Sequence, residues 1–190
     1  MGISVMRQTT TRHAQPNPAN EDLPMDSFSS LMEFAVAIAG FSGITMAVQA
    51  RNAVVNELQV FRNTNLISFS LFAAFGSAIP QACAHLGATG PQLWSWSSTV
   101  FSLVSGVLLI IPFAARSSLS PETRSQLSKT IWFPAVGGTF VVPTTQLLNV
   151  AGAFGEPGPA PLYLGIVWLI FLAALMYARM LVGLRHSSSA

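Results

Sequence analysis

Charged residues are scarce in this chain. Only 8% of its 190 residues are Asp, Glu, Lys or Arg, whereas soluble domains carry about 25%. Because a water-soluble fold needs a charged exterior, this shortage excludes an ordinary soluble domain. The charges are also unevenly spread, since residues 63–115 contain none. We therefore expect a membrane protein.

Metal-binding and catalytic residue types are equally sparse. Cys83 is the sole cysteine, which excludes an intrachain disulfide and a cysteine-rich metal site. The histidines His13, His85 and His186 are too far apart in the sequence to form a haem or zinc pair. No nucleophile stands beside a base, and no glycine-rich phosphate loop is present. The sequence predicts no catalytic residue, no metal, no cofactor and no nucleic-acid binding.

Long hydrophobic runs, by contrast, are abundant. A helix needs about 20 residues to cross about 30 Å of hydrocarbon, and a helix satisfies its own backbone hydrogen bonds there. A transmembrane barrel would instead show short strands with alternating polarity, and no run alternates in this way. The predicted fold class is all-α, a polytopic membrane helical bundle with five transmembrane helices. The expected spans are residues 30–50, 66–86, 93–115, 131–153 and 162–184.

The expected domain organisation follows from these spans. Residues 1–29 are polar without periodicity and predict a disordered N-terminal arm. Residues 30–184 form the transmembrane helical bundle, and residues 185–190 form a short C-terminal tail. The arm lacks the apolar stretch of a cleavable signal peptide. Met25 is an alternative start, so whether residues 1–24 belong to the natural protein stays open.

Basic residues predict the orientation of the bundle. Cytoplasmic loops of membrane proteins carry an excess of Lys and Arg near the span ends. With five spans, seven of the nine basic residues fall on one side, while Arg7 and Arg12 lie far from the first span. We therefore expect the N-terminus outside and the C-terminus in the cytoplasm. The seven residues are Arg51, Arg62, Arg116, Arg124, Lys129, Arg179 and Arg185.

Small residues recur along the first span. Ala35, Ala39, Gly43 and Ala47 are spaced every four positions and therefore lie close to one helix face. Such a ridge lets a second helix approach closely and gain van der Waals contacts. The partner helix belongs either to the same chain or to a second copy in a homo-oligomer, and both alternatives stay open.

One acid lies within a span. Glu33 stands about one turn inside the first span, and a carboxylate at membrane depth is a functional candidate by default. The alternative is an interfacial role, in which Glu33 reaches the lipid headgroups and favours the positive end of its own helix.

Uncharged polar residues accompany this acid at the same expected depth. Gln81 and His85 follow Pro80 in the second span, and Gln146 and Asn149 lie in the fourth, which we expect to be the central helix. Alternating span directions place all of them in the outer half. They form either an outward-facing polar pocket or a set of hydrogen bonds between helices. We call Glu33, Gln81, His85, Gln146 and Asn149 the polar cluster.

Several of these features together resemble a known group of proteins. They are the run at residues 39–44 (AGFSGI), Arg62 opening the second span, Pro80 within it, Trp94 entering the third, and QLLN at residues 146–149. This pattern is similar to a group of small uncharacterised bacterial integral membrane proteins. The resemblance implies several spans in a bacterial inner membrane, and it brings no reaction, ligand or catalytic residue.

We therefore expect a non-enzymatic structural, assembly or signalling component of the membrane. Its expected partner is the lipid bilayer, association with a second copy in a homo-oligomer stays open, and composition does not identify another protein partner. The alternative is a small transporter or channel subunit that uses the polar cluster. An intramembrane enzyme is the third reading.

Overall fold

The structure, a computed structural model, describes residues 19–50, 57–125, 127 and 129–187. This part of the chain contains helices and no strand, which confirms the predicted all-α class. The helices are α1 (Ala19–Ala50), α2 (Glu57–His85), α3 (Gly90–Ser117), α4 (Pro121–Ser125), α5 (Lys129–Val150) and α6 (Ala160–Ser187).

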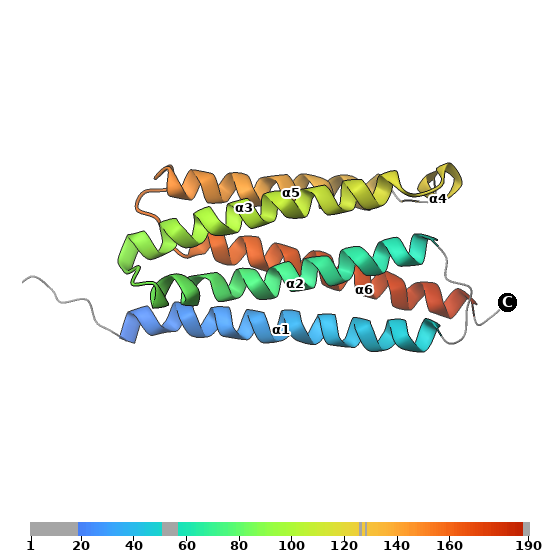
Figure 1. Ribbon diagram of the computed structural model, residues 1–190, viewed down its shortest axis with the longest axis horizontal. Coiled ribbons are helices and arrows are strands. Elements are labelled where there is room, and N and C mark those ends of the chain that lie inside the picture. The colour runs from blue at the N-terminus through green and yellow to red at the C-terminus, as the bar shows by residue number, and fades with distance from the viewer. Residues whose placement is uncertain (1–18, 51–56, 126, 128, 188–190) are drawn as a thin grey trace, which may run out of the picture.

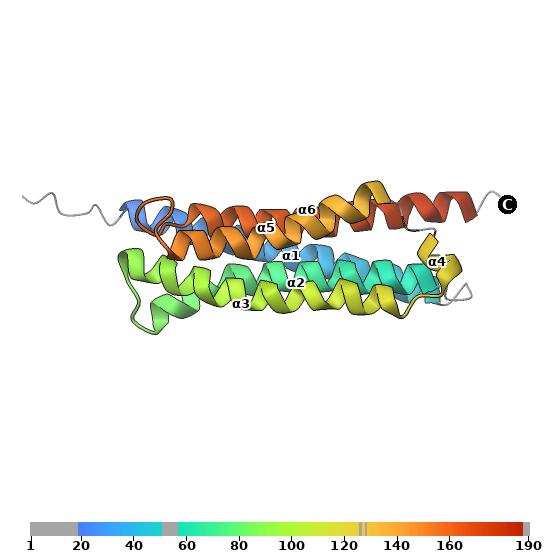
Figure 2. The same ribbon diagram turned by 90° about the horizontal axis from the view of Figure 1, so that it is seen from above.

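The long helices run side by side along the longest axis, and the short α4 lies at one end (Figures 1 and 2). Helix α2 packs against α1, α3 and α6, whereas α5 packs against α3 and α6. We expected the helix with Gln146 and Asn149 to be central, and this is wrong. Helix α5 lies at an edge because only one of its faces is polar, while Phe140 and Leu147 are exposed on its other side.

Four helices of the described chain are long and apolar enough to cross a membrane, namely α1, α2, α3 and α6. The sequence predicted five spans, and the expected span at 131–153 corresponds to α5. Helix α5 has 22 residues, which is enough for a crossing, but part of its N-terminal half lies outside the described side chains. Helix α5 is not one of the four helices found to be long and apolar enough.

Two helices end in the same capping motif. Gly87 follows α2 with φ of +89°, and Gly152 follows α5 with φ of +74°. In each case, the amide of the residue after the glycine donates a hydrogen bond to the carbonyl five positions earlier. These bonds run from Ala88 N to Cys83 O (3.1 Å) and from Ala153 N to Leu148 O (2.9 Å). Glycine adopts this left-handed backbone without strain and so ends the helix. The connections from α2 to α3 and from α5 to α6 lie at the same end of the bundle, which we call the hairpin end (Figure 1).

The helices extend beyond the predicted spans. Residues 19–29, which we assigned to a disordered arm, are the first turns of α1, so that assignment is wrong there; residues 1–18 lie outside the described residues. The cause is Phe28, which is buried and packs its ring against Trp94 (6.0 Å between centroids) and Tyr163 (5.9 Å). Likewise α6 continues to Ser187, so the predicted tail is helical at 185–187.

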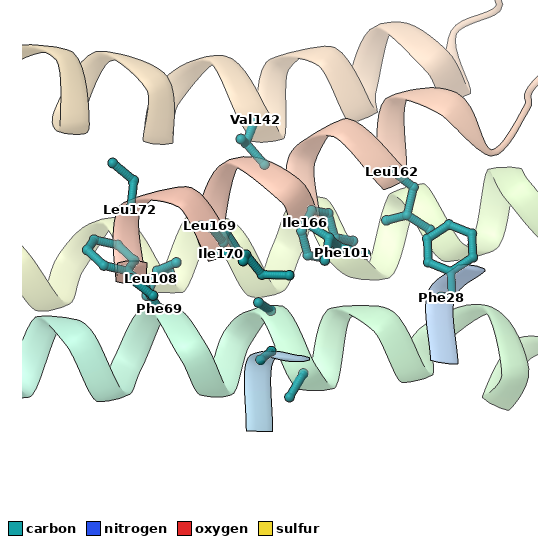
Figure 3. Close-up of a cluster of buried hydrophobic side chains, with 14 of the residues drawn as sticks. Phe28, Phe69, Phe101, Leu108, Val142, Leu162, Ile166, Leu169, Ile170 and Leu172 are labelled. Carbon is teal, nitrogen blue, oxygen red and sulfur yellow. The ribbon is translucent and has the colours of Figure 1, made fainter. Parts of the chain in front are cut away.

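Close contacts between rings and glycines hold the centre of the bundle together. The ring of Phe101 in α3 is fully buried beside Ile166 of α6 (Figure 3). It lies against Gly76 of α2 and Gly165 of α6, and a Cβ built on Gly165 would be 3.0 Å from Phe101 Cε1. These glycines therefore let three helices approach at one point, because any larger residue would meet the ring.

The other end of the bundle carries the positive charge. Helix α4 begins there after Ser120, whose Oγ accepts a hydrogen bond from the Thr123 amide (3.4 Å) and caps the helix. The Ser120 amide donates to Glu57 Oε2 (3.2 Å), which ties α4 to the start of α2. We call this the basic end. The basic residues of the described helices at this end are Arg62, Arg116, Arg124, Lys129, Arg179 and Arg185.

Candidate functional site

Gln81, His85, Gln146 and Asn149 lie in the last turns of α2 and α5, at the hairpin end, whereas Glu33 lies near the middle of α1. They do not converge on one site. Glu33 on α1 and Gln81 and His85 on α2 have exposed side chains. Gln146 and Asn149 on α5 are buried, with 0% and 2% of their surface exposed. The structure thus brings two of the five residues together.

Asn149 connects three segments of the chain. Its amide nitrogen donates to Ser98 Oγ in α3 (2.9 Å) and to the Gly158 carbonyl in the connection between α5 and α6 (3.1 Å). The Gly158 amide in turn donates to Asn149 Oδ1 (3.3 Å). Both polar atoms of the Asn149 side chain therefore form hydrogen bonds within the fold, and this residue holds the three segments together.

Gln146 lies one turn earlier on the same face of α5. Its Nε2 donates to the carbonyl of Pro161 at the start of α6 (2.8 Å). That carbonyl belongs to the first helical turn. In the described part of the structure, Gln146 Oε1 and Ser97 Oγ of α3 are both buried and have no hydrogen-bond partner. The inward-facing polar groups at this end are thus satisfied only in part.

A cavity of about 510 Å³ lies between α5 and α6, beneath their connection. Its walls are mainly apolar, with Val142 and Leu164 on facing helices, while Asn149, Thr145 and Glu156 supply polar groups. A neighbouring cavity of about 340 Å³ lies between the start of α6 and Phe28 of α1. Ala160 and Leu164 line both cavities, so the N-terminal part of α6 is flanked on two sides by apolar hollows.

The predicted packing ridge on α1 is divided between two faces. Ala35 is fully buried and Ala39 is half-buried, whereas Gly43 and Ala47 are exposed. The face of α1 that packs into the bundle repeats every seven residues through Phe28, Ala35 and Ser42. A spacing of four drifts around the helix relative to this repeat. The ridge therefore starts inside the bundle and turns outward by Gly43.

The exposed glycines of α1 differ from those in the bundle. A Cβ built on Gly40 or Gly43 would meet nothing within 4 Å. By contrast, Gly76 lies against Phe101, and Gly138 of α5 lies directly against the indole of Trp168. Inside the bundle, these glycines make room for a ring. In the described part of the chain, no side chain packs against the outward-facing glycines of α1.

Within the described residues, no three His, Cys, Asp or Glu side chains come together as a metal site would require. Comparison with known protein families, with curated proteins and with solved structures found no match for this chain.

Sequence reasoning missed two features of the structure. Ser98 was not among the expected site residues, because a serine within a helix commonly bonds its own backbone, and only the fold shows it as the partner of Asn149. Arg62 and Arg179 were counted among the cytoplasmic charges, and only the antiparallel contact of α2 with α6 brings them near one another. No local signal pointed to either pair, because their members are far apart in the chain.

Proposed function

We propose that this chain is an integral protein of the bacterial inner membrane that works by lateral association of helices. In this proposal it is a structural, assembly or signalling component without catalytic activity, and its partner is a second copy of the chain. The observation that carries the proposal is the outward face of α1, where Gly40 and Gly43 are open to the surroundings.

Glycine within a helix costs about 1 kcal/mol relative to alanine. At Gly76 and Gly138 this cost is offset by the close approach of a neighbouring ring. No such contact is available to Gly40 or Gly43 from the described chain. A second helix laid on this face would gain the backbone approach and dispersion contacts that lipid tails do not supply.

The same face supports a second copy as the partner. Between Phe34 and Ala47 it is uncharged and combines small residues with the exposed side chains of Phe41 and Ile44. A twofold interface must be complementary to itself. An uncharged face of small and large apolar residues meets that condition, because the bulky groups of one copy can lie over the glycines of the other.

The proposed topology has five spans, with the basic end in the cytoplasm and the N-terminus outside. It is supported by the described arginines, which gather at the basic end. Arg51 lies outside the described residues.

The alternative of a transporter or channel subunit has less support. It needs the polar cluster to line one path, yet Glu33, Gln81 and His85 have exposed side chains on α1 and α2, apart from the buried pair on α5. The cavity between α5 and α6 has mainly apolar walls and is not a polar path.

The test compares two glycine variants of the full chain in a mild detergent. Gly43→Ile places a bulky residue on the proposed interface, and Gly137→Ile places the same residue on an exposed, equally open position of α5. We expect the wild type and Gly137→Ile to have the mass of an oligomer and Gly43→Ile to become monomeric. An unaltered mass for Gly43→Ile, or a monomeric wild type, would contradict the proposal.

A further inference from the structure

Two arginines lie at the same level of the basic end, on neighbouring antiparallel helices. Arg62 lies in the second turn of α2, and Arg179 lies about two turns before the end of α6. Gly76 of α2 lies against Ile166 of α6, so the antiparallel register places residue 62 opposite residue 180. Both arginine side chains are half-buried.

No acid balances this pair within the described part of the chain. Neither guanidinium forms an ion pair or a hydrogen bond there. The residues three or four positions from Arg62, which share its helix face, are Leu58, Gln59, Asn65 and Leu66. The nearest acid on α2 is Glu57, and its carboxylate accepts a hydrogen bond from the Ser120 amide beside α4.

Two partly desolvated like charges are costly to hold together unless an anion lies between them. The planar guanidinium presents paired N–H donors that match the oxygens of a phosphate group. At the end of an apolar bundle, long arginine side chains reach the depth of the lipid headgroups. The anion available at that depth is the phosphodiester of a phospholipid.

We propose that Arg62 and Arg179 form a binding site for the phosphodiester group of an anionic phospholipid, held between α2 and α6. The site does not depend on oligomerisation through α1, which lies on another face of α2. Its consequence is that anionic lipid fastens the N-terminal end of α2 to the C-terminal end of α6.

The binding test uses the full-length protein in a neutral detergent, titrated with short-chain phosphatidylglycerol and, separately, with phosphatidylcholine and inorganic phosphate. The variants are Arg62→Gln, Arg179→Gln, the double variant and Arg124→Gln. Arg124 is the matched control because it is an exposed arginine of the same end whose guanidinium donates to the Ser117 carbonyl (3.1 Å). Its loss changes the net charge by the same amount.

We expect the wild type and Arg124→Gln to bind phosphatidylglycerol alike and in preference to phosphatidylcholine. Each of Arg62→Gln and Arg179→Gln should bind about tenfold more weakly, the loss expected for one charged hydrogen-bonding group. Because both arginines act on one phosphate, the double variant should lose less than the product of the two single effects. Equal losses in all three single variants would indicate general charge attraction and overturn the proposal.

A second measurement distinguishes a binding site from a merely structural role. In neutral detergent without anionic lipid, Arg62→Gln removes repulsion, so it should melt no lower than the wild type. With phosphatidylglycerol present, the order should reverse, because only the wild type is stabilised by binding. A variant that melts lower in both conditions would contradict the site. Binding of inorganic phosphate without any response to phosphatidylglycerol would overturn the assignment to a lipid.

Discussion

The amide nitrogen of Asn149 donates a 2.9 Å hydrogen bond to Ser98 Oγ, joining α5 to α3 across 51 positions of the chain. The same side chain exchanges two hydrogen bonds with the backbone of Gly158. The connection between α5 and α6 is therefore fastened to the bundle by one residue. The fold uses a polar group that the sequence offered as a candidate for solute binding.

Replacing this residue should cost stability. Asn149→Leu leaves the partly buried Gly158 amide and the buried Ser98 hydroxyl without their partner, and an orphaned buried polar group costs about 1–3 kcal/mol. We expect the free energy of unfolding in detergent to fall by about 2 kcal/mol or more. The control is Thr144→Val, since the exposed Thr144 hydroxyl bonds only its own helix at Phe140 O. It should change stability by less than about 0.5 kcal/mol. Equal losses of stability in the two variants would contradict the structural role of Asn149.

The type and order of the long helices were predictable from the sequence, because apolar runs and glycine-marked turns are local signals, but the helices are longer than the expected spans. Gly87 directly follows the expected second span, as observed, whereas Gly152 ends α5 although we expected it inside the fourth span. The direction in which each helix faces was not predictable. In a membrane the outward face is as apolar as the inward face, so hydrophobic periodicity does not separate them. Glu33 and Gly43 face outward for reasons that only the packing of α1 on α2 reveals.

The contact of Phe101 with Gly76 leads to a second prediction. A methyl group at residue 76 would collide with the fully buried ring, so Gly76→Ala should lower the free energy of unfolding by about 1–3 kcal/mol. Gly106→Ala on α3 meets nothing within 4 Å and should be neutral or stabilising by up to about 1 kcal/mol.

The double variant Gly76→Ala with Phe101→Leu checks the cause. The smaller side chain leaves room for the methyl group, so the combined loss should be less than the sum of the two single losses. Strict additivity would show that the ring and the glycine do not interact.

The proposed topology predicts which connections react with an impermeant thiol reagent. In a Cys83→Ala background, a cysteine at the exposed Ala153 should be labelled from outside intact cells. A cysteine at the exposed Glu122 in α4 should be labelled only after the membrane is permeabilised. The reverse pattern would invert the orientation, and labelling of both from outside would contradict five spans.

The polar cluster shows why the candidate site was only partly predictable. Alternating helix directions place Gln81, His85, Gln146 and Asn149 at the same end of the bundle, because direction follows from the number of helices between them. Convergence also requires that each side chain face inward. Gln81 and His85 lie near the C-terminus of α2 with exposed side chains, whereas Gln146 and Asn149 are buried on α5.

The central claim is that two copies associate through the outward face of α1, and cysteine crosslinking in native membranes tests it most directly. Single cysteines replace Gly40 or Ile44 in the Cys83→Ala background, and Val141→Cys supplies an equally exposed control on α5. We predict covalent dimers for the two α1 positions on mild oxidation and none for the control. Monomers at all three positions, or dimers in equal amounts, would contradict association through this face.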